Sequence, residues 1–211
     1  MRGIIFAGGE APSADFIKSL VKKDDYIICL DSGLEYADMA GVTPSVILGD
    51  FDSVSEATLE KYRAKNITVN TFPADKDFTD MELGISEAVR AGVDELILIG
   101  ALGGRIDHAL GNIDNMLQAL NAGIKTAIYD ERQHIFLLNS GRSFHYKKGT
   151  VVSLIPFSGI VEGVSTQNLT YPLKNEALIK GYSRGVSNTF TEDTAVIDFK
   201  SGILQVVINI L

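Results

Sequence analysis

The stretch that decides the fold is VILGDFDS, at residues 46–53. Its first three residues are apolar, as in a strand that is buried on both faces of a parallel sheet. Asp50 and Asp52 follow this strand, and residues two apart in an extended segment point the same way. Both carboxylates can therefore face one ion. An Asp-rich turn that ends the strand, with Ser53 capping the next helix, is the other interpretation that the local sequence allows.

Acidic residues follow a second predicted strand in the same manner. The stretch TVNTF at residues 68–72 precedes DKDFTD at residues 75–80. The carboxyl ends of parallel strands form one edge of a sheet, and ligands bind along that edge. Several carboxylates gathered there repel one another unless a cation lies between them. Hard oxygen ligands suit Mg²⁺, so the sequence predicts a magnesium site that also receives the phosphates of a nucleotide.

Each of the later acids also has a purely structural explanation. Asp80 follows Thr79, the expected N-cap, and the partial positive charge of a helix N-terminus favours a carboxylate there. Asp75 and Asp77 can be solvated loop acids. Lys76 can contact a phosphate oxygen or simply offset the neighbouring acids. The convergence of two acidic strand ends is what favours the ion.

A regular alternation of strand-like and helical segments fills the first part of the chain. It predicts right-handed crossovers and a three-layer α/β domain with a mostly parallel, Rossmann-like sheet, which we place at residues 1–132. Capping boxes mark two expected helix starts, Ser53 with Glu56 and Thr79 with Glu82. The expected strands are residues 4–7, 26–30, 46–48, 68–72, 96–99 and 126–129, and the expected helices are residues 14–22, 34–40, 56–65, 80–91 and 107–121.

The pattern changes after about Gln133. Short strand-like runs follow one another there, separated by turn signals and without a convincing amphipathic helix. This predicts a small all-β domain, a sandwich, at residues 133–211. The expected strands are residues 151–155, 160–164, 195–199 and 204–208.

Composition and charge exclude several classes of partner. The chain has 211 residues, 45% of them hydrophobic and 22% charged, with a net charge of -8. Neither nucleic acid nor an anionic membrane is expected as a partner, because no basic patch neutralises phosphate. An acidic protein can still bind nucleotide when a divalent ion carries the compensating charge. With no run as long as a membrane span, no signal-like N-terminus and Cys29 as its single cysteine, we expect a cytoplasmic protein.

A glycine-rich segment follows the expected strand at residues 96–99. Gly103 and Gly104 let backbone N–H groups approach an anion closely at the start of a helix. Arg105 can offer a planar fork to phosphate. The alternative is a glycine turn in which Asp107 caps the helix and Arg105 pairs with a nearby acid.

Other polar segments carry less information. Residues 8–10, GGE, and residues 31–33, DSG, follow strands and can line the same edge, holding phosphate or ribose. Neither matches a P-loop or a GxGxxG fingerprint. The three histidines lack metal-ligand spacing, so a zinc site is not expected. Residues 181–189 form a polar stretch that can grip a small ligand or serve only as a loop.

Five segments, in this order, make the chain similar to the thiamine pyrophosphokinase family, also called thiamine diphosphokinase. They are DSG at 31–33, GDFDS at 49–53, DKDFTD at 75–80, LGGRIDH at 102–108 and SNT at 187–189. Each segment is weak alone, but the combination is specific and spans nearly the whole chain.

The resemblance implies a transferase that moves the diphosphoryl group of ATP to the hydroxyl of thiamine, giving thiamine diphosphate and AMP. It implies an α/β catalytic domain that binds ATP and Mg²⁺, followed by a β-sandwich domain that binds thiamine. It also implies a homodimer with active sites where the subunits meet.

Residue roles follow from the same resemblance. Asp50, Asp52 and Asp80 correspond to the acids around Mg²⁺ and the transferred group. Arg105, together with Lys76, would stabilise charge on phosphate oxygens. Asp80 or Asp77 would accept the alcohol proton, and the sequence does not choose between them. The residues expected to bind the substrates are Asp31, Ser32, Gly33, Lys76, Thr79, Gly103, Gly104, Asp107, His108, Ser187 and Asn188.

One position departs from the family pattern. Some members stack thiamine on a tryptophan near the final strand, but this chain has no tryptophan and Gln205 stands at that position. The affinity for the vitamin and its exact ring system are therefore less determined than the chemistry. Two alternatives stay open, a Mg²⁺-dependent nucleotide phosphohydrolase and a non-enzymatic sensor of nucleotide or thiamine.

Overall fold

The chain folds into two compact units, Met1–Glu131 and Arg132–Leu211. The computed structural model describes residues 1–72 and 77–210. Asp75 and Lys76, which the sequence places near the phosphates, lie outside the described residues.

The first unit is built on a parallel sheet of six strands. Every neighbouring pair in it is parallel, in the order β6-β5-β1-β2-β3-β4. All of these strands except the edge strand β4, which is mostly exposed, are nearly continuous apolar runs. Ile4, Ile28, Ile47 and Leu98 in them are almost fully buried, as strands covered on both faces require. The strands are β1 Arg2–Phe6, β2 Tyr26–Leu30, β3 Val46–Gly49, β4 Thr68–Thr71, β5 Glu95–Ile99 and β6 Lys125–Tyr129.

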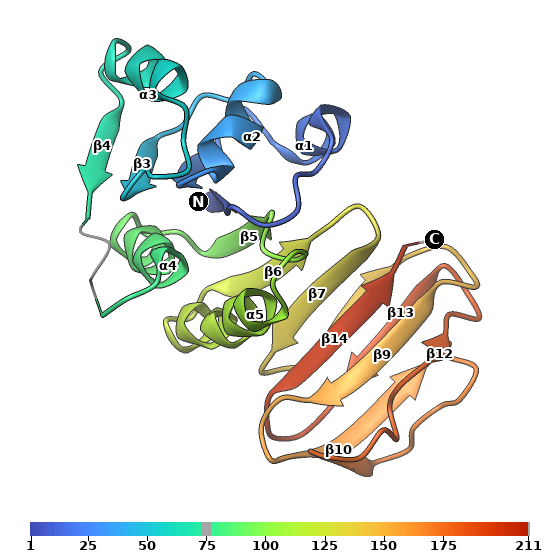
Figure 1. The fold of residues 1–211 in the computed structure, drawn as a ribbon. Coiled ribbons are helices and arrows are strands. Elements are labelled where there is room, and N and C mark those ends of the chain that lie inside the picture. The colour runs from blue at the N-terminus through green and yellow to red at the C-terminus, as the bar shows by residue number, and fades with distance from the viewer. Residues whose placement is uncertain (73–76, 211) are drawn as a thin grey trace. The chain divides into compact units, whose positions relative to one another are not determined.

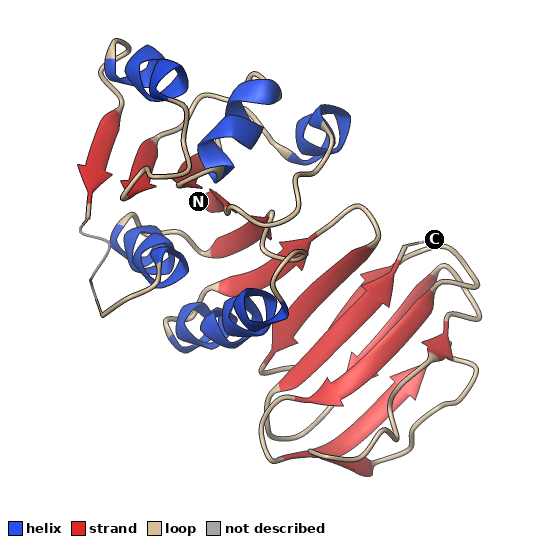
Figure 2. Cartoon of the chain, viewed as in Figure 1, coloured by secondary structure: helices blue, strands red, loops and turns tan. Residues whose placement is uncertain are grey.

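Helices cover both faces of this sheet (Figures 1 and 2). On one face, α4 packs against β2, β3 and α5, and α5 packs against β6. On the other face, α2 packs against β1 and β2, with α1 and α3 beside it. The helices are α1 Ala14–Leu20, α2 Gly33–Met39, α3 Glu56–Arg63, α4 Asp80–Arg90 and α5 Ile106–Asn121. The predicted three-layer, Rossmann-like domain is confirmed.

The strand order reverses between β1 and β5. From β1 the chain builds outward through β2, β3 and β4, then crosses to β5 on the other side of β1. The loops that follow these two strands are held together, because the Gly9 N–H donates to the Gly100 carbonyl at 2.7 Å and the Glu10 N–H to the Leu102 carbonyl at 2.8 Å. In open α/β sheets such a reversal point, at the carboxyl ends of the strands, is where ligands bind.

The second unit contains two antiparallel sheets of four strands. One has the order β12-β9-β14-β7 and the other β11-β10-β13-β8. Apolar side chains alternate along β14, and the Phe136 and Phe144 rings meet at 5.0 Å. The predicted all-β sandwich is thus confirmed. Its strands are β7 Gln133–Leu138, β8 Arg142–His145, β9 Val151–Pro156, β10 Ile160–Gln167, β11 Glu176–Ile179, β12 Asn188–Thr189, β13 Thr194–Asp198 and β14 Leu204–Asn209.

Four of these strands, β7, β8, β11 and β12, were not expected from the sequence. Three have a simple reason: β8 and β11 are edge strands with one buried residue each, and β12 is two residues long. Such strands carry no apolar alternation. The fourth, β7, is a compact apolar run that directly follows the change of pattern near Gln133.

The helix starts confirm one capping box and correct another. Thr79 and Glu82 form the expected box, with the Glu82 N–H donating to Thr79 Oγ1 at 3.3 Å and the Thr79 N–H to Glu82 Oε2 at 2.8 Å. The box expected at Ser53 is wrong, because α3 is capped by Ser55, which accepts from the Thr58 N–H.

The start of α5 differs from the alternative in which Asp107 caps the helix. Arg105 occupies the N-cap position of α5, and Asp107 lies in the first turn of the helix rather than capping it. Within the described residues, no helix has the length and apolar character needed to cross a membrane.

Gly33 should tolerate no side chain, because a Cβ there would lie 2.2 Å from the Phe6 carbonyl oxygen at the start of α2. We expect Gly33→Ala to lower the free energy of unfolding by about 1–3 kcal/mol, as overpacking does. Gly111 is the matched control, since it lies within α5 and a Cβ there meets nothing within 4 Å. Gly111→Ala should stabilise by about 0.5–1 kcal/mol. Urea unfolding measures both, and equal effects would contradict the packing described.

Candidate active site at the carboxyl edge of the sheet

Asp31 stands directly after β2 in a left-handed backbone conformation, with φ of 42°. Its carboxylate turns toward the end of β3, where Oδ1 accepts a 3.3 Å hydrogen bond from the Phe51 N–H. The approach is so close that a Cβ on Gly49 would fall 1.8 Å from Asp31 Oδ1. Gly49 is therefore required for the two strand ends to meet.

Carboxyl groups from three separate elements influence one another here. Asp31, after β2, is hydrogen-bonded to Asp80 at the start of α4, and the charge of Asp50, after β3, also acts on it. Burial, the hydrogen bond with Asp80 and the neighbouring negative charges together raise the pKa of Asp31 to about 7. The Asp31 carboxyl thus keeps its proton up to about pH 7, which relieves the repulsion from the neighbouring carboxylates.

The donor set fits a hard divalent cation without forming a finished cage. Among residues 1–72 and 77–210, no three His, Cys, Asp or Glu side chains lie close enough to hold a metal ion as they stand. Asp31 and Asp80 touch, whereas Asp50 acts on Asp31 only through its charge. Carboxylate oxygens gathered in this way are chemically suited to Mg²⁺, which would supply the neutralising charge in place of the Asp31 proton.

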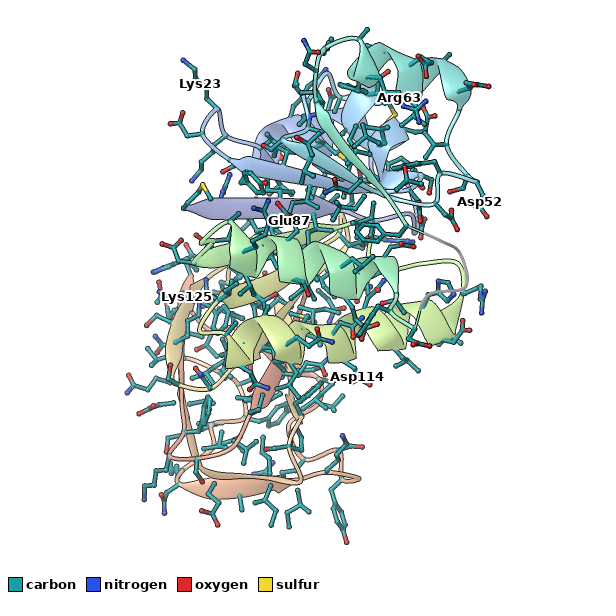
Figure 3. The ribbon with its side chains drawn as sticks, turned by 90° about the vertical axis from the view of Figure 1, so that its left-hand side faces the viewer. Lys23, Asp52, Arg63, Glu87, Asp114 and Lys125 are labelled. Carbon is teal, nitrogen blue, oxygen red and sulfur yellow. The ribbon has the colours of Figure 1, made fainter. Side chains whose placement is uncertain are left out.

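Asp52 lies at the same edge but points outward. Its side chain is exposed, and its N–H donates to Asp50 Oδ1 at 3.1 Å. Figure 3 places Asp52 at the opposite end of the sheet from Lys23 and Lys125, which mark the amino ends of β2 and β6. The local Asp turn weighed from the sequence is therefore present, and Asp52 is also on the edge that the ion hypothesis needs.

The segment after Asp31 closes against the loop that follows β1. A Cβ on Gly8 would lie 2.4 Å from Ser32 Oγ, and Gly33 presses on the end of β1. Tyr36, one turn further along α2, donates its hydroxyl to the Gly9 carbonyl at 2.7 Å. The two low-specificity segments, residues 8–10 and 31–33, therefore do lie together at the edge.

The Arg105 side chain is engaged with an acid of its own segment. Nε and Nη2 donate to the Asp107 carboxylate at 3.1 and 2.5 Å, and this lowers the pKa of Asp107 to about 2. The Arg105 side chain is 70% exposed. Gly103 and Gly104 both have positive φ, and His108 is exposed in the first turn of α5. Arg105 therefore pairs with a nearby acid, which is the structural alternative that the sequence allows for it.

Asp77 and Thr79 flank the start of α4. Both side chains are exposed, and Thr79 serves as the N-cap described above. No described contact brings Asp77 to Asp31 or Asp50.

The expected thiamine-side residues lie within the second unit. Ser187 has φ of 59°, and its N–H donates to Ser153 Oγ at 3.1 Å. Asn188 is buried, and its amide makes two hydrogen bonds to the Tyr171 backbone, at 2.9 and 2.7 Å. The Asn188 side chain thus stabilises the backbone at Tyr171, while the Ser187 side chain is exposed. Gln205 is half-buried in β14, between Leu137 and Ile155.

Asp31 is predicted from the sequence as a substrate-binding residue, but its contact with Asp80 is not predicted. The signal was present, because Asp31 follows β2 just as Asp50 follows β3. The missing information was tertiary: β2 and β3 are neighbours in the sheet, and α4 packs against both.

These features define a class of protein. The chain is a two-part protein, with a doubly wound α/β unit that carries acids along the carboxyl edge of its parallel sheet and an all-β sandwich unit after it. In α/β proteins of this class, ligands bind at that edge.

Comparison with known proteins gives the family within this class. The chain matches the models "Thiamin pyrophosphokinase, catalytic domain" over residues 17–128 and "Thiamin pyrophosphokinase, vitamin B1 binding domain" over residues 134–204. It therefore belongs to the thiamin pyrophosphokinase family. Thiamine pyrophosphokinase of Bacillus subtilis (strain 168) is 28% identical over 202 residues, which cover 95% of this chain and 94% of that protein.

Solved structures of the family are similar along the whole chain. The crystal structure of thiamine pyrophosphokinase from Bacillus subtilis matches with a TM-score of 0.90 and 26% identity, covering 99% of each chain. The crystal structure of thiamin pyrophosphokinase from Geobacillus thermodenitrificans matches with a TM-score of 0.87 and 28% identity, covering 100% of this chain and 98% of that one.

The raised pKa of Asp31 predicts a pH-dependent stability. The unfolded chain loses this proton near the ordinary value of 3.8, whereas the folded protein keeps it to about 7. Between these values the folded state binds more protons, so its stability falls as pH rises. In metal-free buffer, Asp31→Asn should therefore gain melting temperature relative to wild type as pH rises from 4 to 7, and the gain should level off above that.

Asp24→Asn is the control for this experiment, because Asp24 lies in the exposed turn before β2, at the opposite edge. Its melting temperature should follow wild type across the pH range. Parallel profiles for Asp31→Asn and wild type would contradict the described contact between carboxyl groups.

Proposed function

We propose that this chain is a thiamine diphosphokinase, which transfers the diphosphoryl group of ATP to the hydroxyl of thiamine and releases AMP. One observation carries the proposal: a catalytic and a vitamin-binding family model match consecutive parts of the same chain. Asp31, Asp50 and Asp80 gather at the carboxyl edge of the parallel sheet, and this supports the proposal on physical grounds.

The two units would divide the work. The first, residues 1–132 in the division proposed from the sequence, would bind ATP, and the second, residues 133–211, would bind thiamine. We include in the proposal the homodimer with active sites at the subunit interface that the family resemblance implies.

The transfer forms one bond and breaks one bond at phosphorus. The hydroxyl oxygen of thiamine attacks the β-phosphorus of ATP, the bond from that phosphorus to the oxygen of AMP breaks, and AMP leaves. The hydroxyl proton goes to a carboxylate, for which Asp80 and Asp77 are the candidates. Reactions of this kind need positioning and charge neutralisation more than covalent help from protein.

Asp50, Asp52 and Asp80 would hold Mg²⁺, and Asp31 would support them through its contact with Asp80. When bound, Mg²⁺ supplies positive charge to the β- and γ-phosphates. Arg105 would exchange its carboxylate partner Asp107 for phosphate oxygens, which present a similar fork of acceptors. Lys76 would add a second cation, and Ser187 would contact thiamine from the second unit.

Product analysis tests this function. Purified protein with ATP and Mg²⁺ is incubated with and without thiamine, and the products are identified and quantified by mass spectrometry. Wild type should yield AMP and thiamine diphosphate in equal amounts, and only when thiamine is present. Asp50→Asn and Asp52→Asn should lower the rate by about 10²–10³-fold, the range seen when a transition-state charge stabiliser is lost.

Asp24→Asn again serves as the matched control and should keep wild-type turnover, with circular dichroism showing that all variants are folded. AMP without any acceptor would identify a nucleotide phosphohydrolase instead. Saturable binding of ATP or thiamine without AMP would identify a sensor. Near-normal turnover in both edge variants would remove these acids from the mechanism.

A further inference from the structure

The loop that carries Asp50 and Asp52 is weakly held by its own backbone. It runs from Gly49, the last residue of β3, to Ser55, the N-cap of α3. Its described internal hydrogen bonds are one of 3.1 Å from the Asp52 N–H to Asp50 Oδ1 and one of 3.4 Å from the Val54 N–H to the Phe51 carbonyl, and the second is longer than usual. Phe51 and Val54 pack against the core of the first unit. These apolar contacts hold the middle of the loop. The direction of the Asp50 and Asp52 carboxylates also depends on what holds the two ends of the loop.

Glu35 of α2 holds the far end of this loop. Its Oε1 accepts from the Ser55 N–H at 2.8 Å, the shortest of the hydrogen bonds described for the backbone N–H groups of this loop. Its Oε2 accepts from the Thr58 hydroxyl at 2.9 Å, and the Ser55 hydroxyl donates to Thr58 Oγ1 at 2.8 Å. The three side chains form a closed set of hydrogen bonds around the first turn of α3.

The charge state of Glu35 agrees with this role. Burial alone would raise its pKa, but the hydrogen bonds from Ser55 and Thr58 lower it below the ordinary value. Glu35 is therefore ionised at neutral pH, and an ionised acceptor makes stronger hydrogen bonds than a neutral one.

The other end of the loop is held from the same short segment of chain. Asp31 accepts from the Phe51 N–H, and Glu35 follows four residues later in α2. This segment is rigid because Leu34 and Ala37 of α2 are fully buried. Asp31 and Glu35 hold the two ends of the loop, and the distance between them is fixed because both belong to the segment where α2 begins.

We propose that Glu35 is a positioning residue that sets the direction of Asp50 and Asp52 by fixing Ser55 at the end of their loop. The inference rests on the proposed function for its kinetic consequence, but the positioning itself can be measured in metal-free protein. Glu35 touches neither substrate nor reacting atoms in this account.

The chain offers a matched control in Asp38, one turn further along α2. Its Oδ1 accepts from Lys61 Nζ at 2.5 Å and from the Tyr62 hydroxyl at 2.7 Å. These contacts also join α2 to α3, but they reach the last turn of α3 and not the acidic loop. Asp38→Ala therefore loosens the same pair of helices without releasing Ser55.

Amide hydrogen exchange of the metal-free protein tests the positioning. Glu35→Ala should speed exchange at Phe51 and Asp52 by about tenfold, because an unfixed loop opens more often. Glu35→Gln keeps an oxygen that can accept from the Ser55 N–H and should restore most of the protection. Asp38→Ala should leave these two amides as in wild type, although both alanine variants lower the melting temperature.

Kinetics then separate positioning from general stability. In Glu35→Ala, the Mg²⁺ concentration for half-maximal rate should rise several-fold and kcat should fall about tenfold, with KM for thiamine unchanged. Asp38→Ala should show none of these changes. A 1 Å misplacement of reacting groups is enough to produce losses of this size.

Three results would overturn the proposal: unchanged exchange at Phe51 and Asp52 in Glu35→Ala, acceleration confined to Ser55, or the same changes in Asp38→Ala. Failure of the proposed function is distinguishable, because wild type would then form no thiamine diphosphate while the exchange result still stands or falls by itself.

Discussion

The contact between the carboxyl groups of Asp31 and Asp80 is the constraint on which the rest of the site depends. The carboxyl ends of parallel strands lie at one edge of the sheet, and here the ends of β2 and β3 and the start of α4 bring acids to that edge. Without a neutralising charge such an arrangement is unfavourable, and the raised pKa of Asp31, which keeps that carboxyl protonated up to about pH 7, relieves it. In the proposed function, a divalent ion with polyphosphate would perform the same neutralisation while presenting phosphorus to an acceptor, which is why we assign diphosphoryl transfer to this edge.

The sequence predicts the parallel sheet well because its buried strands consist of continuous apolar runs bounded by glycine and acidic residues. It predicts the antiparallel unit less completely. Strands such as β8, with only Phe144 buried, are defined by pairing with β13 and carry no pattern of their own. The true cap of α3 is missed for a related reason. Ser53 and Ser55 are equally good local caps, and the choice is made by the tertiary hydrogen bond from Ser55 to Glu35.

The site shows the same division between local and tertiary information. Asp50 and Asp80 are predicted from their positions after strands, but the contact of Asp31 with Asp80 follows only from the packing of α4 against β2. Asn188 illustrates the converse. Its amide is committed to the Tyr171 backbone, so a residue of a family motif stabilises a loop and leaves Ser187 exposed beside it. Motif membership thus identifies the segment, while hydrogen bonding identifies which side chain is available.

Diffraction from crystals grown with Mn²⁺ and a non-hydrolysable ATP analogue tests the central claim most directly. Manganese replaces magnesium in oxygen-rich sites and can be located by its anomalous signal. The account predicts one peak within coordination distance of Asp50 and Asp80 oxygens, in contact with the phosphates, at the carboxyl edge of the parallel sheet. A peak elsewhere, or phosphates bound with these carboxylates turned away from the ion, would contradict it.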